Sequence, residues 1–385
     1  MVYSISKEGG SIKSRNALSI GFLFVIAFLG CSQKNSGWKL GTPLSKETIK
    51  VAIIHPNEID KNSLYDYAHY LGTVEMQRNI GLDDSQIIRR FNVLDNEPAV
   101  AEGIIRDCIA EGANIIIAPS WGYMDVCARL AREFPSVVFA HATGYRFNDV
   151  NFVNYSVKLY QARYLSGIVA GLSTQSGLIG YVAAMGTDNS EVTGGINAFA
   201  IGVEEVNPEA RVLVHITYNW YDPMGETDAT NELIASGCDI IASHCNTASP
   251  QIAARKAGVR SIGFNSDMSV DAPNSVITSV IPRWGVFYTR LVESIINGTF
   301  RPESYFLGLE DGVVDITPLN EKLAPPGVQE AVDAARQRIL NGYNVFDGEL
   351  FTNTGAIIGT AGETLPNHII LGSVNWYYRN VILIK

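Results

Sequence analysis

The chain has 385 residues, of which 46% are hydrophobic, and its 29 basic and 39 acidic side chains give a net charge of −10. The apolar content is ordinary for a globular protein and permits a sizeable core. The acidic balance argues against a nucleic-acid partner, which requires a basic footprint.

The chain opens with a pattern typical of a secreted protein. Lys7, Lys13 and Arg15 precede an apolar stretch at 17–30, and Cys31 follows it directly. The stretch is shorter than the ~20 apolar residues of a membrane-spanning helix and suits the apolar region of a secretory signal. A small residue followed by Cys resembles a bacterial lipobox, so we expect residues 1–30 to be a lipoprotein signal peptide and Cys31 to be acylated. An ordinary signal or an uncleaved anchor is the alternative.

Residues 31–48 are polar and predict a flexible tether. The other four cysteines are Cys108, Cys127, Cys238 and Cys245, and their spacings match no zinc or CxxC pattern. We expect free, buried thiols, with a disulfide in an oxidising compartment as the alternative.

From residue 49 onward, short β-rich runs alternate with helical patterns. Runs such as 114–118 (NIIIA) and 136–140 (SVVFA) are continuously apolar, which suits a parallel sheet covered on both faces. The alternation predicts an α/β fold with two doubly wound, Rossmann-like lobes. The expected strands are 49–54, 87–93, 114–118, 136–140, 178–183, 211–216, 239–242, 259–263, 275–280 and 305–309. The expected helices are 63–79, 98–111, 124–133, 160–173, 191–206, 227–236, 250–257, 285–297 and 328–341.

This pattern also predicts how the chain is divided. We expect an N-terminal lobe at 49–156, completed by about 275–305. The C-terminal lobe is expected at 157–272, completed by about 306–385, so the chain crosses between the lobes and completes both sheets.

Aromatic side chains gather at the expected strand ends. Ligands of open parallel sheets bind outside the carboxyl ends of the strands, and Trp121, Trp220 and Trp284 fall at or just past such ends. Neutral Asn, Ser, Thr and His side chains accompany them. Flat walls with neutral hydrogen-bonding groups suit a planar, polar, uncharged ligand, because base stacking on an aromatic ring is worth about 1–3 kcal/mol.

Other ligand classes lack their usual motifs. Phosphate would call for a glycine-rich loop or a Lys/Arg clamp after a strand, but no glycine-rich phosphate motif follows a strand, and Arg146 and Arg283 are the only cations at the strand ends. His55, His141 and His244 follow different strands without metal-ligand spacing, so we expect no metal and no cofactor.

Several longer stretches, in order along the chain, resemble one known family. They include 65–69 (YDYAH), 160–171 (YQARYLSGIVAG), 220–223 (WYDP), 263–268 (GFNSDM) and 308–315 (GLEDGVVD). From about residue 49 to its end, the chain resembles the basic membrane protein (Bmp) family, lipoproteins that bind purines or purine nucleosides for ABC importers.

The resemblance implies a fold and a set of site residues. The fold would be that of a type I periplasmic binding protein, with two α/β lobes, a three-stranded hinge and the ligand in the cleft. Tyr65 and Trp220 would be stacking walls, and Asp267 would take ribose hydroxyls or a base edge. Asn265 stands at the position where the family usually has its first acidic residue. Because that carboxylate is missing, both a purine base and a purine nucleoside remain candidate ligands. The remaining pocket residues would be His69, Trp121, Thr143, Asn246 and Trp284.

We therefore expect a lipid-anchored binding protein, without catalytic residues, that captures a purine base or nucleoside by closure of two lobes. It would be a monomer on a bacterial cell-envelope membrane, facing the periplasm or the exterior, and would deliver its ligand to an ABC permease. A sugar-binding receptor of the same fold is the alternative. A nucleoside-processing enzyme is less favoured, because Asp188, Asp222 and Asp267 follow different strands rather than forming a cluster.

Overall fold

The computed structural model describes residues 44–59 and 63–384. The expected signal peptide, Cys31 and the first part of the tether lie outside the described residues.

The first sheet has six parallel strands in the order β11-β5-β4-β3-β1-β2. Alternate residues of β1 and β3 belong to two separate apolar cores, one shared with α1 and α8 and the other with α2 and α3. Helices therefore cover both faces, as the continuously apolar strands predict. The strands are β1 (Val51–Ile54), β2 (Ile87–Arg90), β3 (Ile115–Ala118), β4 (Val138–Ala142), β5 (Phe152–Val157) and β11 (Ser304–Leu307). The helices are α1 (Leu64–Ile80), α2 (Pro98–Ala110), α3 (Met124–Glu133) and α8 (Trp284–Ile296).

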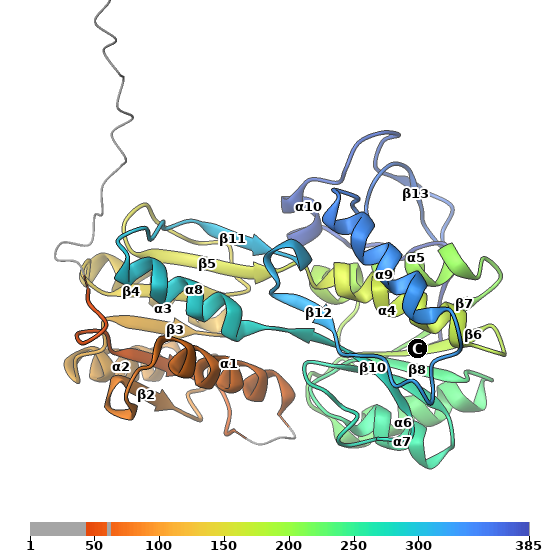
Figure 1. Ribbon diagram of the computed structural model, residues 1–385, viewed down its shortest axis with the longest axis horizontal. Coiled ribbons are helices and arrows are strands. Elements are labelled where there is room, and N and C mark those ends of the chain that lie inside the picture. The colour runs from red at the N-terminus through yellow and green to blue at the C-terminus, as the bar shows by residue number, and fades with distance from the viewer. Residues whose placement is uncertain (1–43, 60–62, 385) are drawn as a thin grey trace, which may run out of the picture. The chain divides into compact units, whose positions relative to one another are not determined.

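The second sheet has seven strands in the order β12-β10-β9-β8-β6-β7-β15, with β12 alone antiparallel to its neighbour. Helices α6 and α7 cover one face, and α4, α5 and α9 lie on the other (Figure 1). The strands are β6 (Leu178–Ala183), β7 (Arg211–Ile216), β8 (Ile240–His244), β9 (Arg260–Phe264), β10 (Val276–Pro282), β12 (Val314–Ile316) and β15 (Val381–Leu383). The helices are α4 (Leu159–Ser173), α5 (Ser190–Val206), α6 (Pro223–Ala235), α7 (Ser249–Lys256) and α9 (Val328–Leu340).

Short elements complete the described chain. They are the 3₁₀ turns η1 (Asp84–Gln86), η2 (Trp121–Tyr123) and η3 (Leu309–Asp311), the hairpin β13 (Leu350–Phe351) and β14 (Ile357–Ile358), and α10 (Asn367–Gly372). No helix of the described chain combines the length and the apolar character that a membrane span requires.

The chain passes between the two sheets where β5 leads into α4, where β10 leads into α8, and where β11 leads through η3 into β12. Because β5 and β10 run toward these crossings, the carboxyl ends of the two sets of parallel strands face each other there. The α/β architecture with two doubly wound lobes is confirmed.

Some sequence-based expectations differ from the structure. Strand β10 pairs in the second sheet, beside β9, although 275–305 was expected to complete the first lobe; α8 and β11 do lie with the first sheet. The exact lobe boundaries stay a prediction. Strand β5 was missed because its sequence, FVNYSV, interrupts the apolar run with Asn154 and Ser156, which the fold nevertheless buries.

Two glycines explain why α4 and α5 pack closely. A Cβ at Gly167 would lie 2.1 Å from the Phe199 carbonyl oxygen, and one at Gly202 would lie 2.2 Å from that of Tyr164. The backbones approach too closely for any larger residue, which accounts for a glycine inside the 160–171 stretch. The four expected free cysteines are also confirmed: each is buried and unpaired.

Candidate functional site

Backbone strain marks the carboxyl ends of the parallel strands. In the part of the chain that the structure describes, the non-glycine residues with positive φ are Asn92, Thr143, Tyr218 and Asn265. Each lies one or two residues past a strand, namely β2, β4, β7 and β9. Such conformations cost about 1–3 kcal/mol and cluster at ligand clamps, so they favour a site at this edge of each sheet.

An aromatic cluster joins the start of α1 to the start of α8. His69 is fully buried and stacks on Trp284, with ring centroids 4.4 Å apart and planes 17° from parallel. The Tyr65 ring meets His69 edge-on at 4.5 Å, and His69 Nδ1 lies 2.5 Å from the Tyr288 hydroxyl. The structure therefore brings together three of the predicted site residues.

Two ring nitrogens in this cluster have no hydrogen-bond partner among the residues that the structure describes. They are Nε2 of His69 and Nε1 of Trp284, and both are buried. Burial holds the pKa of His69 well below its usual value, so its ring is neutral. A buried polar nitrogen without a hydrogen bond destabilises the protein by about 1–3 kcal/mol. A ligand that formed hydrogen bonds with both nitrogens would remove this cost, which would favour its binding.

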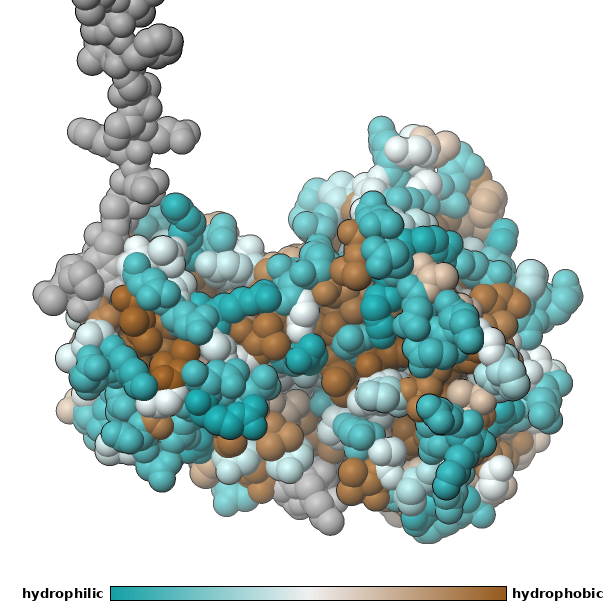
Figure 2. Space-filling view, viewed as in Figure 1, coloured by the Kyte–Doolittle hydropathy of each residue, from teal (hydrophilic) through white to brown (hydrophobic). Residues whose placement is uncertain are grey.

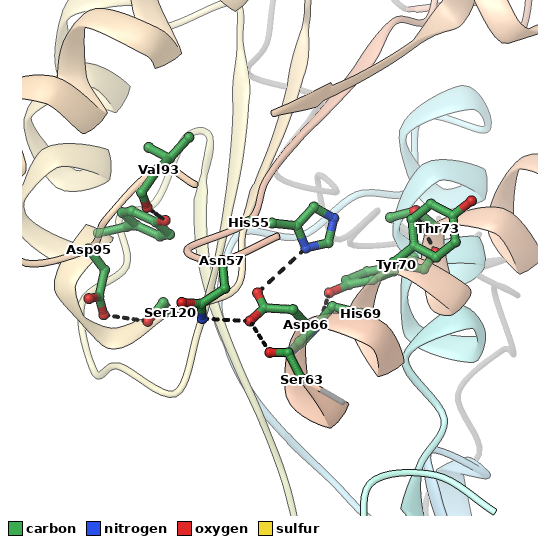
Figure 3. A network of polar contacts seen from close by, with 12 residues as sticks. His55, Asn57, Ser63, Asp66, His69, Tyr70, Thr73, Val93, Asp95 and Ser120 are labelled. Carbon is green, nitrogen blue, oxygen red and sulfur yellow. Dashed lines mark hydrogen bonds and ion pairs between the residues drawn. The ribbon is translucent and has the colours of Figure 1, made fainter. Parts of the chain in front are cut away.

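A carboxylate that the sequence analysis missed lies next to Tyr65. Asp66 is 1% exposed, and its Oδ2 accepts hydrogen bonds from Asn57 Nδ2 at 2.8 Å and Ser63 Oγ at 3.2 Å (Figure 3). Its Oδ1 lies 3.7 Å from His55 Nδ1 and accepts no hydrogen bond from the described part of the chain. The only sequence signal was an acidic residue in the first turn of a helix, which also fits ordinary stabilisation of a helix start.

Further carboxylates influence the Tyr65 hydroxyl electrostatically. Burial raises the pKa of Tyr65 well above its usual value, and the charges of Glu191, Asp66 and Asp95 raise it further. Asp95 accepts a hydrogen bond from Ser120 Oγ at 2.6 Å, and Glu191 comes from the first turn of α5, beside the other sheet. The surroundings of this predicted stacking residue are thus acidic, whereas the sequence analysis expected mainly neutral groups.

The loop after β8 meets the start of α1. The backbone N–H of Leu64 donates to the Asn246 carbonyl oxygen at 3.1 Å, and Asn265 Nδ2 lies 3.4 Å from Asn246 Oδ1. Because the first N–H groups of a helix have no partner within the helix, Asn246 satisfies one that would otherwise be free. This contact joins the helix that carries Tyr65 to the sheet that carries Trp220.

A buried histidine lies beside Trp220, and a buried arginine packs near that histidine. The Trp220 ring meets His244 edge-on at 6.0 Å, and His244 Nε2 lies 3.8 Å from Glu191 Oε1. Arg163 is fully buried, donates to the Ser243 carbonyl oxygen at 2.9 Å and stands 4.3 Å over the Phe264 ring. Burial, assisted by the Arg163 charge, lowers the pKa of His244 to about 4 against the influence of Glu191.

The remaining predicted residues stand apart. Trp121 is 56% exposed and contacts the Tyr145 ring at 5.9 Å. Asp267 is exposed and accepts from the Ser269 N–H at 3.0 Å, while Thr143 Oγ1 donates to the Ala142 carbonyl oxygen. Among the described residues, these three make no hydrogen bond or ring contact with the rest of the predicted set.

The site offers groups for non-covalent binding. The described residues contain no group of three or more His, Cys, Asp or Glu side chains placed to hold a metal ion. The nearby thiol of Cys245 is fully buried, which raises its pKa well above the usual value and keeps it protonated. Aromatic rings, unpartnered nitrogens and carboxylate oxygens can together hold a flat, polar solute.

Comparisons with known proteins agree with this architecture. Two curated relatives match over most of their lengths: a purine-binding protein of Brucella abortus, 31% identical over 89% of this chain and 95% of its own, and a protein of Haloferax volcanii, 32% identical over 84% and 83%. The name of the second assigns it, provisionally, to glucose binding by an ABC transporter. A solved solute-binding protein of an ABC transporter from Conexibacter woesei shares the fold, with a TM-score of 0.65 and 24% identity over 76% of this chain and 97% of its own.

The Bmp family profile, described as PnrA-like ABC transporter substrate-binding proteins, matches residues 48–346. The fold is the type I periplasmic-binding-protein fold. An extracytoplasmic role with a permease as partner follows from family membership. The chain therefore belongs to the Bmp family and is a solute-binding protein of an ABC transporter.

Proposed function

We propose that the solute is a purine base or nucleoside, held between aromatic walls contributed by both lobes. The observation that carries this proposal is the aromatic cluster of Tyr65, His69 and Trp284, whose two buried ring nitrogens have no protein partner. A flat heterocycle offers a face for stacking and edge atoms for those nitrogens. The purine-binding relative from Brucella abortus supports the same solute class.

The mechanism is capture by closure. Tyr65, on α1, forms one wall and Trp220, in the loop after β7, forms the other. The Leu64–Asn246 hydrogen bond joins these two sides. Movement about the crossings between the sheets would open and close the site without covalent chemistry.

The charges around Tyr65 further restrict the solute. Asp66, Asp95 and Glu191 all act on its hydroxyl, and the guanidinium of Arg163 is fully buried. Carboxylates accept hydrogen bonds from N–H and O–H groups and repel phosphate. A base or nucleoside should bind, and the corresponding nucleotide should be rejected.

The remaining site assignments are part of this proposal. Asn246 would contact a base edge. Thr143, Trp121 and Asp267 would join the ligand only at the rim, because they lie apart from the aromatic cluster. We also propose that Cys31 carries a lipid anchor that holds a monomeric protein at the bacterial cell-envelope membrane.

A sugar is the second candidate solute. The relative from Haloferax volcanii, whose name refers provisionally to glucose, is 32% identical. Aromatic rings also pack on pyranose faces, and Asp and Asn side chains bind hydroxyl groups. The carboxylates near Tyr65 suit hydroxyl donors as well as N–H donors.

Thermal unfolding of the full chain in mild detergent tests the proposal, with adenine, hypoxanthine, guanosine, inosine, adenosine monophosphate and glucose as additives. A ligand that binds only the folded state adds about 2.7 kcal/mol of stability at a hundredfold excess over its dissociation constant. We expect a base or nucleoside to raise the unfolding temperature and the nucleotide and glucose to leave it unchanged. Stabilisation by glucose alone, or by none of these compounds, would overturn the proposal.

A further inference from the structure

A cavity lies where β10 leaves the second sheet, and its lining includes none of the predicted site residues. It is open to solvent and has a volume of about 490 Å³, which is within the range of small-molecule sites. Its walls come from the end of β10, from β12 and the segment after it, and from α9. Figure 2 shows hydrophobic surface among polar groups over the part of this face where Figure 1 places β10, β12 and α9.

The lining combines an apolar surface with an excess of positive charge. Ile281, Leu319 and Val332 supply aliphatic side chains. The lining contains two guanidinium groups, from Arg283 and Arg336, and one carboxylate, that of Asp315. One positive charge is therefore left without a counter-charge in the lining.

Arg283 carries that uncompensated charge. Its backbone N–H donates to the Val313 carbonyl oxygen at 2.7 Å, which holds the residue at the crossing between β10 and α8. Its side chain is exposed, and its guanidinium has no hydrogen bond or ion pair with any residue that the structure describes.

Arg336 has one free donor as well. Its Nη2 pairs with Asp315 Oδ1 at 2.8 Å, while its Nε is buried and has no hydrogen-bond partner in residues 44–59 and 63–384. A buried donor of this kind is costly to leave unsatisfied. An anionic oxygen could accept from this Nε and pair with Arg283 without breaking the Arg336–Asp315 ion pair.

We propose that this cavity is a second binding site, for a small amphipathic monocarboxylate. Its carboxylate would pair with Arg283 and accept from Arg336 Nε, because guanidinium–carboxylate hydrogen bonds are among the strong ones. A short aliphatic body would pack on Ile281, Leu319 and Val332. This site shares no residue with the proposed purine site, although Arg283 directly precedes Trp284 in the chain.

Titration calorimetry of the full chain in mild detergent tests this site with three probes: hexanoate, acetate and 1-hexanol. Acetate has the carboxylate without the longer aliphatic chain, and 1-hexanol has the aliphatic chain without the charge. We expect hexanoate to bind at least tenfold more tightly than either. If acetate bound as tightly as hexanoate, the contact would be an adventitious anion only, and the proposal would be overturned. It would also be overturned if 1-hexanol bound as tightly as hexanoate.

Two variants locate the binding. Arg283→Gln removes an exposed charge that has no ion pair, so the variant protein should fold normally. Its affinity for hexanoate should be at least tenfold lower than that of the parent. Arg290→Gln is the matched control, because Arg290 is an exposed arginine on α8 outside the cavity. If hexanoate binds the Arg283→Gln protein as well as the parent, as partition into micelles would produce, the assignment is wrong.

Discussion

The Trp284 ring stacks on the buried His69 ring at 4.4 Å, and Trp284 is also the first residue of α8 after the chain crosses from the second sheet. One stacked pair therefore joins the predicted ligand wall on α1 to the hinge. The contact depends on the close approach of α1 and α8, which pack side by side.

The α1–α8 contact leaves no room at Gly72. A Cβ there would lie 2.7 Å from Trp284 Cβ and 3.0 Å from the Gly285 nitrogen. Gly72→Ala should lower the free energy of unfolding by about 1–3 kcal/mol, the usual cost of overpacking. Urea denaturation measures this change.

Gly103 provides the control for Gly72. It lies in α2, it is exposed, and a Cβ there would meet nothing within 4 Å. Gly103→Ala should stabilise the protein by about 0.5–1 kcal/mol, because alanine is the better helix former. If both substitutions stabilised the protein equally, the close packing of α1 on α8 would be refuted.

The proposed stacking role of Trp220 predicts a loss of affinity on truncation. Trp220→Ala should weaken purine binding at least tenfold, since stacking on one aromatic ring is worth about 1–3 kcal/mol. Calorimetry measures affinity, and circular dichroism checks that the protein stays folded. Tyr221→Ala is the control, because Tyr221 is the next residue and is 50% exposed. Unchanged affinity in the Trp220 variant would exclude a stacking role.

Asp66 allows a test of the acidic surroundings of Tyr65. Asn57 and Ser63 donate to one of its oxygens, so in Asp66→Asn the carbonyl oxygen should take that position. The amide group would then replace the unpartnered Oδ1 and present a donor instead of an acceptor. We expect at least a tenfold loss of purine affinity. Asp107→Asn, an exposed carboxylate on α2, should bind as the parent does, and equal affinity of both variants would count against Asp66.

Stability should depend on pH through buried neutral histidines. Burial lowers the pKa of His141 and His244 to about 4, and that of His69 well below its usual value. Between about pH 6.5 and 4 the unfolded chain binds protons that the folded protein does not, so stability is complete above pH 6.5 and falls toward pH 4. For each such proton, the free energy of unfolding falls by about 1.4 kcal/mol per pH unit of acidification in this range. Glu226, whose pKa is raised by burial, acts in the opposite direction.

Denaturant unfolding at several pH values checks this dependence. His368 is exposed, so His368→Gln should leave the slope unchanged. A free energy of unfolding that stays constant from pH 7 to pH 4.5 would contradict the neutral, buried state of the three histidines.

The lipid anchor can be tested in cells. Cys31→Ser removes the acceptor thiol, so the protein should leave the membrane fraction, which immunoblotting of separated fractions detects. Multiple acyl chains give stable anchoring, so the parent should remain bound. Continued membrane association of the variant would indicate an uncleaved anchor instead.

Much of the fold could be predicted, because apolar runs and helical periodicity are local properties of the sequence. Strands such as β3 and β8 are continuously buried, and the helices between strands lie close to their expected positions. Strand β5 was not predicted, because burial of Asn154 depends on neighbouring strands that are distant in sequence.

The candidate site could be predicted only in part. The α/β alternation, the stretches that resemble the family and the aromatic residues at strand ends could all be identified in the sequence. Three features of the site depend on the folded chain: the charges of Asp66, Asp95 and Glu191 act on Tyr65, Arg163 is buried near His244, and Trp121 is exposed. The physical reason is that hydrophobic patterning acts along a segment, whereas the burial and charge of a polar group depend on partners that only folding brings together.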